Sequence, residues 1–431
     1  MNTRTFASLG LAEPLLRVLE AENYTTPTPI QLRAIPRLLE GRDLLGIAQT
    51  GTGKTAAFGL PLLQKLAAGK SHAGARGAQA LILAPTRELA IQIDQSLRTY
   101  GRLLRLRHAL VFGGVNQNPQ IATMKSGVDI LVATPGRLLD LVQQTHIRLD
   151  TVSTLIVDEA DRMLDMGFIR DVRRIVSMLP KARQSMLFSA TMPDGIVKLV
   201  GDMLKNPERV EVAPQSKPIE RIDQHVLFAD AGEKRQLLAR LLADPAFKRV
   251  IVFTRTKHGA NKVAEVLGKG GFGAEAIHGN KSQNARQRAL ERFKSGKAPI
   301  LVATDIAARG IDVDDITHVI NFELPHEPES YVHRIGRTAR AGASGVAISL
   351  VDGSERDRLR QIERLTKQRL NVMAFEGRPN AASAEAPPAS GNGIAAERPK
   401  HNQPKRNRGK RRRPGRKSAN GDRPNRGRRA A

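Results

Sequence analysis

Short apolar runs alternate along the chain with longer amphipathic stretches. Eight of these runs are about as long as a β-strand and apolar on both faces: ALILAP (80–85), DILVATP (129–135), TLIVDEA (154–160), QSMLFSA (184–190), RVIVFT (249–254), PILVATD (299–305), THVINFE (317–323) and GVAISLV (345–351). Such runs are typical of parallel strands that helices cover on both sides. The stretches between them are long enough for crossover helices. The pattern therefore predicts α/β domains with doubly wound parallel sheets.

One predicted helix has clear signals at both ends. Ser282 can cap its first turn, and Gly296 can end it in the left-handed conformation. Between these ends, Ala285, Ala289 and Phe293 fall on one face, which predicts the side that packs against a sheet.

The apolar runs fall into two sets, which predicts two domains. Between the sets, residues 209–219 contain two prolines and charges of alternating sign, as in an exposed linker. No aromatic residue follows Phe375, so the last segment cannot build a core and is predicted to be disordered. The predicted parts are a first domain (1–208), a linker (209–219), a second domain (220–375) and a basic tail (376–431).

The formal net charge of +27 is concentrated at one end of the chain. From Arg398 to Ala431, fifteen lysines and arginines stand against one acid, Asp422, which gives +14 in 34 residues. An excess of this size indicates a polyanionic partner: RNA, DNA or an acidic membrane surface. A solubilising tail is the simpler alternative.

Composition also excludes several classes of protein. There is no cysteine, which excludes disulfides and cysteine-ligated zinc or iron–sulfur sites. The first sixteen residues lack the apolar core of a signal peptide, and no run of about 18 apolar residues predicts a membrane span. We therefore expect a soluble intracellular protein that makes no membrane contact.

The segment AQTGTGKT (48–55) has the pattern of a phosphate-binding loop, although Ala48 stands where the general pattern has glycine. Its glycines let backbone N–H groups close on phosphates at a helix N-terminus. Lys54 is placed to reach the β- and γ-phosphates, and Thr55 to ligate Mg²⁺. The predicted nucleotide contacts of this loop are Gln49, Thr50, Gly51, Thr52, Gly53, Lys54 and Thr55.

A second acidic segment, TLIVDEAD (154–161), follows about one hundred residues later. Its apolar half predicts a strand, and acids stand at the carboxyl end. Asp158 can hold Mg²⁺, mostly through waters, and Glu159 is placed to activate the attacking water. An acidic helix start is the alternative, but the upstream lysine-threonine loop favours a nucleotide site. These two segments predict a P-loop NTPase and leave kinases, transporter ATPases and GTPases open.

The acidic strand end reads Asp-Glu-Ala-Asp at 158–161, and with it the chain resembles the DEAD-box RNA helicases. Motifs resembling the rest of that family's set follow in order over roughly residues 6–350. Two segments, FTRTKHGAN (253–261) and IHGNKSQ (277–283), resemble the bacterial RhlE-type branch. The resemblance implies two tandem RecA-like domains, ATP-dependent RNA helicase activity, ATP and Mg²⁺ as cofactors, and a cytoplasmic bacterial protein.

The resemblance also implies further contacts to the nucleotide. Phe6, Tyr24 and Gln31 resemble an adenine-reading motif, in which the Gln31 amide pairs with a donor and an acceptor of adenine. Tyr24 is expected to stack on the base, although a core aromatic is the alternative. Gly310 and Asp312, at the end of VATDIAARGID (302–312), are expected at the nucleotide.

Loops in both halves resemble the family's RNA contacts. They offer arginines and backbone N–H groups, which bind phosphate and sugar. The RNA-binding residues that the resemblance implies are Pro85, Arg87, Gly114, Thr134, Gly136 and Arg137 in the first half, and Arg255, Gly279, Gln283, Arg286 and Thr304 in the second. The residues that it implies couple ATP to RNA are Ser189, Thr191, Asp161 and His333, with hydrogen bonds expected from the SAT hydroxyls (189–191) to the acidic motif.

The second half contains no phosphate loop, but HRIGRTAR (333–340) supplies arginines. Arg337 and Arg340 are three residues apart, so they share a face if this segment is helical. They are expected to complete the first half's site and to stabilise the charge of the transferred phosphate. The family usually has glycine at the position of Ala339.

The expected mechanism is closure of the two domains on ATP and RNA, followed by local separation of a short RNA duplex. An ATP-gated RNA clamp or annealing factor, a DNA helicase and, more remotely, a metabolic kinase are alternatives. The expected partner is RNA, bound through its backbone and largely independently of sequence. Ribosomal precursors and RNA-decay proteins are further candidates, and we expect a monomer with association through the tail as an alternative.

Overall fold

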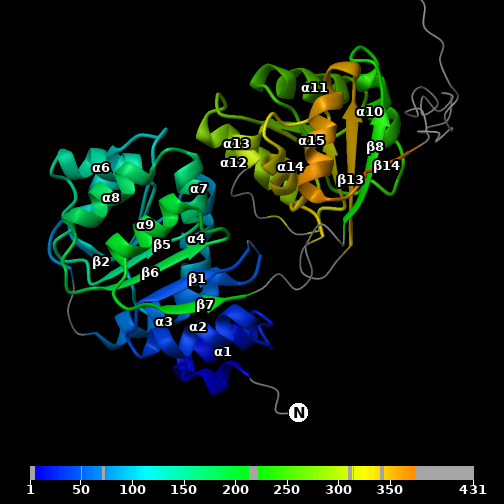
Figure 1. Cartoon of the computed structure of the whole chain (residues 1–431). Helices are drawn as coiled ribbons and strands as arrows, with labels where there is room; N and C mark the ends of the chain where they lie inside the picture. The colour runs from blue at the N-terminus through cyan, green and yellow to red at the C-terminus, as the bar shows by residue number, and fades with distance from the viewer. Residues whose placement is uncertain are drawn as a thin grey trace, which may run out of the picture. The chain divides into compact units, whose positions relative to one another are not determined.

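The computed structural model describes residues 5–49, 51–69, 73–212, 222–308, 313, 315–339 and 344–373. They form two parallel sheets, each covered by helices on both faces (Figure 1). The predicted tail, most of the predicted linker and the residues Thr50, Gly310, Asp312 and Arg340 lie outside the described residues.

The first sheet has seven parallel strands in the order β3-β4-β2-β5-β6-β1-β7. Its strands are β1 (Leu44–Ile47), β2 (Ala78–Leu83), β3 (His108–Val111), β4 (Val128–Ala133), β5 (Thr154–Val157), β6 (Gln184–Ser189) and β7 (Glu208–Glu211). Its helices are η1 (Phe6–Leu9), α1 (Glu13–Ala21), α2 (Pro29–Leu39), α3 (Lys54–Ala68), α4 (Arg87–Tyr100), α5 (Asn118–Met124), α6 (Pro135–Gln143), α7 (Ala160–Asp165), α8 (Ile169–Met178) and α9 (Asp194–Met203).

Successive strand residues in this sheet contribute to different cores. In β2, Ile82 packs with α2, α3 and α4, whereas Leu81 packs in the other core with α6, α8 and α9. This alternation explains why a parallel strand needs apolar residues at every position. All six residues of β4 and of β6 are buried, as the apolar pattern predicts.

The second sheet has seven parallel strands in the order β10-β11-β9-β12-β13-β8-β14. Its strands are β8 (Ile222–Phe228), β9 (Val250–Phe253), β10 (Ala274–Ile277), β11 (Ile300–Ala303), β12 (His318–Asn321), β13 (Gly345–Val351) and β14 (Asn371–Val372). Its helices are α10 (Lys234–Leu242), α11 (Lys257–Lys269), α12 (Gln283–Lys294), α13 (Asp305–Ala308), α14 (Pro328–Ile335), η3 (Gly353–Glu355) and α15 (Arg356–Thr366).

The prediction of two doubly wound parallel-sheet domains is confirmed, as is the helix predicted after Ser282. The Ser282 hydroxyl accepts the Ala285 N–H at 3.3 Å, and Gly296 has φ +74° just beyond the last turn of α12. One boundary differs, because β7 pairs with β1 over residues 208–211 and therefore includes the start of the predicted linker. Only Val210 of this edge strand is buried, so its sequence is as polar as a linker.

Candidate active site and RNA contacts

The phosphate-binding loop lies between the end of β1 and the start of α3. The Thr52 hydroxyl donates to the Gln49 carbonyl at 2.8 Å, and Gly51 and Gly53 have φ of +82° and +87°. A Cβ at Gly53 would come within 2.5 Å of the Gln31 amide nitrogen, so only glycine fits there. Since α3 begins at Lys54, its unpaired N–H groups face this loop, as an anion site requires.

Lys54, the first residue of α3, lies close to Asp158, which directly follows β5. The Lys54 ammonium lies 3.9 Å from the Asp158 carboxylate, and both side chains are buried. Burial raises the pKa of Asp158 to about 6, against the charge of Lys54 and with a contribution from the Glu159 carboxylate. A buried carboxylate of this kind gains from a nearby cation.

The donors around Asp158 fit a magnesium ion. Among the described residues no three His, Asp or Glu side chains gather into a metal cage. Mg²⁺ often binds to one or two carboxylates, waters and substrate phosphates, which matches a site with Asp158 and the Thr55 hydroxyl at a phosphate loop. When bound, such an ion would neutralise charge on the phosphates.

Glu159 lies at the junction of β5 and α7. Its backbone is left-handed, with φ 52° and ψ 51°, and its carboxylate accepts a hydrogen bond of 2.6 Å from the Arg162 guanidinium. The backbone N–H of Glu159 donates to the Asp158 carboxylate at 2.9 Å. The two acids are therefore held in a fixed relation to each other.

The hydrogen bonds expected between the acidic motif and the SAT segment are present. One oxygen of Asp161 accepts from the N–H groups of Ala190 and Thr191 at 3.0 and 2.9 Å and from the Thr191 hydroxyl at 3.2 Å. The Ser189 hydroxyl accepts the Asp161 N–H at 3.3 Å and donates to the Thr191 carbonyl at 2.7 Å. The end of β6 is thus tied to the start of α7, beside the nucleotide site.

The residues expected at the adenine have different environments. Phe6 is buried in the core of the first domain. Tyr24 is 40% exposed, so the alternative of a core aromatic does not apply. Its hydroxyl lies 3.2 Å from that of Tyr100, and the two rings meet edge to face.

The Gln31 amide makes two hydrogen bonds within the protein. Its oxygen accepts the Thr28 N–H at 2.9 Å, and its nitrogen donates to the Gly53 carbonyl at 3.1 Å. An amide can accept two hydrogen bonds and donate two, so these contacts use half of the capacity of the buried Gln31 amide. Gln31 therefore links the start of α2 to the phosphate loop.

In the first domain, the structure brings three expected RNA contacts together. Arg87 begins α4, and its guanidinium covers Gly114, where a Cβ would overlap it. Arg137 donates to the Val115 carbonyl at 3.3 and 3.4 Å. Pro85 and Thr134 are buried, whereas Gly136 is exposed and has open space at its Cα. This cluster can offer guanidinium and backbone groups to phosphates.

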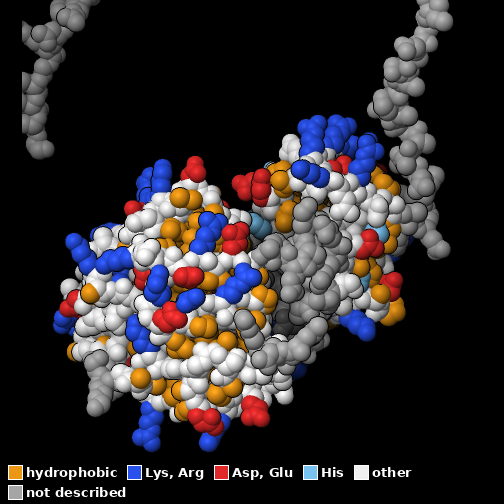
Figure 2. All heavy atoms as spheres, turned by 60° about the horizontal axis from the view of Figure 1, so that its bottom comes forward, with side chains coloured by type: hydrophobic (Ala, Val, Ile, Leu, Met, Phe, Trp, Pro, Cys, Tyr) orange, Lys and Arg blue, Asp and Glu red, His pale blue; other side chains and the backbone are white. Residues whose placement is uncertain are grey.

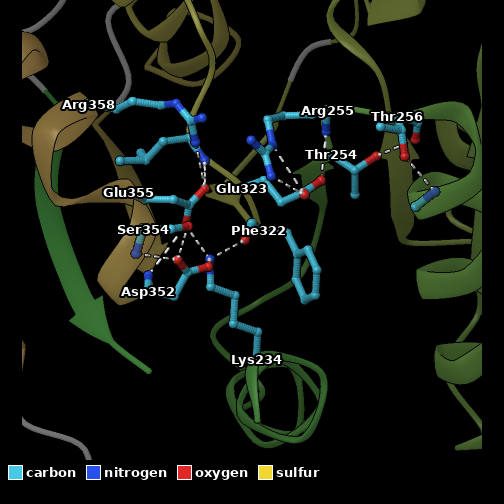
Figure 3. Close-up of polar contacts among 12 residues, drawn as sticks. Lys234, Thr254, Arg255, Thr256, Phe322, Glu323, Asp352, Ser354, Glu355 and Arg358 are labelled. Atoms are coloured by element: carbon cyan, nitrogen blue, oxygen red, sulfur yellow. Dashed lines mark hydrogen bonds and ion pairs between the residues drawn. The ribbon is translucent and has the colours of Figure 1, made fainter. Parts of the chain in front are cut away.

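In the second domain, Arg255 is held by Glu323 (Figure 3). The Arg255 N–H donates to one carboxylate oxygen at 2.9 Å, and its Nε and Nη2 donate to the other at 3.2 and 3.0 Å. Residues on both sides of Glu323 contact a buried ion pair. The Phe322 carbonyl accepts from Lys234 at 3.3 Å, and the Leu324 N–H donates to Glu355 at 3.0 Å.

The other expected contacts of this domain stand at strand and helix ends. Gly279 is exposed in the turn before α12, and Gln283 and Arg286 lie in the first turn of that helix. Thr304 follows β11 directly. Figure 2 shows lysines and arginines spread among acidic and apolar side chains over the face in view.

The arginine motif differs from the helical prediction. α14 ends at Ile335, so Arg337 lies beyond it and the shared helical face does not apply. The Arg337 Nε donates to the His333 carbonyl at 3.2 Å, His333 itself is exposed, and Arg337 is buried. Ala339 has φ 55°, a conformation that favours glycine, which explains why the family usually has glycine here.

Arg334 is buried and joins several segments of the second domain by hydrogen bonds. Sequence reasoning assigned no role to this residue. Its guanidinium donates to both oxygens of Asp305 at 2.5 and 2.8 Å, to Asn321 at 3.1 Å and to the Glu323 carbonyl at 2.6 Å. It also lies 5.0 Å from the centre of the Phe253 ring. Its contacts come from three different strand ends, and no sequence spacing would have revealed them.

A phosphate loop after β1, a buried acidic pair at the end of β5 and a second sheet of the same kind define a P-loop NTPase with two RecA-like domains. Sequence profiles agree in both halves: that of the DEAD/DEAH box helicases matches residues 28–199, and that of the helicase conserved C-terminal domain matches residues 233–342.

Curated relatives and solved structures extend this likeness over most of the chain. The DEAD-box ATP-dependent RNA helicase CshA of Geobacillus kaustophilus is 44% identical over 369 residues, 86% of this chain and 78% of the relative. CshA of Bacillus subtilis is 43% identical over 371 residues, 86% and 74% of the two chains. The structure of Saccharomyces cerevisiae Dbp5 bound to RNA and ADP BeF3 matches with TM-score 0.75 and 30% identity, covering 86% of this chain and 95% of that one. Mss116p bound to ssRNA and AMP-PNP matches with TM-score 0.77 and 28% identity, covering 88% and 80%.

The chain therefore belongs to the DEAD-box ATP-dependent RNA helicases. The sequence-based prediction of the family is confirmed. The narrower likeness to the RhlE-type branch is not supported, because these curated relatives are named CshA. Within the described part of the chain, none of the helices has the length and apolar character that crossing a membrane requires.

Proposed function

We propose that this chain couples ATP binding and hydrolysis to closure of its two domains on RNA. Closure bends the bound strand, opens short duplexes locally and remodels RNA or ribonucleoprotein. The observation that carries this proposal is the set of hydrogen bonds that Asp161 accepts from Ala190 and Thr191. Through them, a change at the nucleotide can reach the end of β6.

The proposed chemistry divides between the two domains. Lys54 holds the phosphates, and Glu159 takes a proton from the attacking water. Arg337 and Arg340 approach the γ-phosphate only after closure, with Gly310 and Asp312 beside the nucleotide. Arginines placed in this way contribute roughly 10³–10⁵ in rate. Asp158 and Thr55 would hold Mg²⁺.

RNA contacts in this proposal lie on both domains. Arg87, Gly114 and Arg137 form one half of the groove, and residues such as Arg255 and Arg286 form the other. The RNA and nucleotide analogues in the structures of Dbp5 and Mss116p support this assignment. The basic segment 398–431 would hold further RNA without sequence preference.

A balance between open and closed forms sets the energetic requirement. To move the population from 1:99 to 99:1, ATP and RNA together must favour the closed form by about 5.5 kcal/mol. Several charge-assisted hydrogen bonds to the γ-phosphate and the RNA backbone can together supply a free energy of this order.

Displacement of a strand from a short RNA duplex tests the proposal directly. The full chain is expected to release the labelled strand with ATP and not without it, and Glu159→Gln is expected to hold RNA and ATP with only slow residual hydrolysis. ATP-dependent holding of RNA by the parent chain with no displacement would contradict the duplex-opening step and favour a clamp. Equal stimulation of hydrolysis by single-stranded DNA would contradict RNA as the substrate.

A further inference from the structure

Glu159 is held in place more tightly than a helix-capping acid requires. As the residue before α7, it has a left-handed backbone, which is unfavourable for any residue other than glycine or asparagine. Strained conformations of this kind persist only where the surroundings fix them, and they are frequent at active sites. The Glu159 side chain is also only 4% exposed.

Arg162 supplies the partner that this buried carboxylate needs. Its guanidinium donates to one oxygen of Glu159 at 2.6 Å, and its own side chain is 11% exposed. The Arg162 backbone N–H donates to the Asp161 side chain at 3.0 Å, so the residue is anchored at both ends. A carboxylate buried without such a partner would be strongly disfavoured.

Two ion pairs with the same spacing on helix surfaces are different in kind. Arg37 with Glu40, and Arg360 with Asp357, are also three residues apart, but their side chains are about half exposed or more. Exposed pairs of that type contribute little and hold no fixed geometry. The pair at Glu159 is buried at the head of the nucleotide site, where geometry matters most.

We propose that Arg162 is the positioning residue of Glu159. It fixes one carboxylate oxygen and thereby keeps the other aimed at the attacking water. This inference rests on the role proposed above for Glu159 as the base. Arg162 touches neither water nor nucleotide in this scheme and acts only through that carboxylate.

The test measures RNA-stimulated ATP hydrolysis by the full chain with Arg162→Met, which keeps the length of the side chain and removes its charge. We expect kcat to fall by about tenfold to a hundredfold, as for partners that orient a reacting group, while KM for ATP stays within about twofold. Arg162→Lys, which keeps the charge but loses the planar fork, is expected to recover part of kcat. Arg360→Met is the matched control and is expected to behave like the parent.

A double-mutant cycle separates positioning from a general structural effect. In single-turnover hydrolysis, adding Arg162→Met to Glu159→Gln should cause no further loss, because the carboxylate that Arg162 orients is already gone. A further loss of the same size in that background would overturn the inference, as would a normal kcat for Arg162→Met.

Two outcomes distinguish this inference from the proposed function. Normal hydrolysis by Glu159→Gln would overturn the assignment of the base itself. A collapse of hydrolysis in Glu159→Gln with a normal Arg162→Met would leave the base in place and overturn only the positioning role. If Arg162→Met fails to bind ATP, Arg162→Lys is the deciding variant. A kcat equal to the parent's in Arg162→Lys would show that the planar guanidinium is not needed to orient Glu159, which would overturn this part of the inference.

Discussion

The two domains have the same strand order, since β1 to β7 correspond one by one to β8 to β14. Each has a lysine as the first residue of the helix after its first strand, Lys54 in α3 and Lys234 in α10. Lys54 lies 3.9 Å from its carboxylate at the phosphate loop. Lys234 contacts two carboxylates, Asp352 at 3.0 Å and Glu355, as well as the Phe322 carbonyl (Figure 3).

This difference explains why only the first of these two lysines stands at a phosphate-loop pattern. An ammonium has three protons, and those of Lys234 have three acceptors within the protein. The loop before it, residues 229–233, contains a single glycine, whereas AQTGTG before Lys54 leaves backbone N–H groups for phosphate. The same fold therefore carries a site in one copy and a structural ion pair in the other.

Lys54→Ala tests the catalytic side of the comparison and should have the largest effect. RNA-stimulated phosphate release is expected to fall by on the order of a thousandfold, about 4 kcal/mol of lost transition-state stabilisation. The melting temperature should stay close to the parent's, because the pair with Asp158 is loose. Substantial hydrolysis by this variant would mean that the lysine does not contact the phosphates.

Lys234→Met tests the structural side. It leaves Glu355, which is fully buried, without its closest cation, and breaking a buried pair of this kind costs roughly 3 kcal/mol or more. Denaturant unfolding of the full chain should show the loss in the second domain's transition. A variant as stable as the parent would show that Asp352 and Glu355 do not need the ammonium.

Glu323→Gln tests whether the network around Lys234 serves RNA binding. Loss of a negative charge alone would tighten RNA binding, whereas weakening of the three hydrogen bonds that Glu323 accepts from Arg255 should reduce it. We expect a weaker affinity by roughly fivefold, about 1 kcal/mol, since the pair is partly exposed. The control is Glu265→Gln, which removes the same charge from an exposed pair with Lys269. Tighter binding by Glu323→Gln would make Glu323 a competitor of RNA instead.

The sequence was sufficient where burial on both faces left consecutive apolar residues, as in residues 130–133 of β4 and 186–188 of β6. It was insufficient at or near sheet edges, where β3 alternates buried and half-buried residues and β7 buries only Val210. Whether such a segment forms a strand depends on its pairing with a neighbouring strand and not on its own composition.

The site shows the same division. The phosphate loop and the acids that follow β5 could be predicted because each is a contiguous segment with a fixed spacing. Arg334 could not, since its partners Asp305, Asn321 and Glu323 come together only in the folded domain. Arg162 was within reach, because arginine three residues after an acid on a predicted helix start is a recognisable pair.

Two buried histidines complete the comparison and give the smallest expected effect. In the first domain, His108 lies 3.1 Å from the Asp94 carboxylate, and hydrogen bonds from His108 and Arg98 outweigh burial and lower the pKa of Asp94. In the second domain, His318 stacks on Phe247, with ring centres 3.9 Å apart, and burial lowers its pKa despite the nearby charge of Asp244.

Because the folded chain binds a proton at His318 more weakly than the unfolded chain, stability should fall as pH drops through about 6.5. The slope from this one group is at most about 1.4 kcal/mol per pH unit, and the nearby charge of Asp244 offsets part of the effect of burial. His318→Gln should reduce the difference between urea midpoints measured at pH 7.5 and 5.5. An unchanged difference would mean that acid destabilises the protein elsewhere, with the carboxylates of the first domain as the next groups to test.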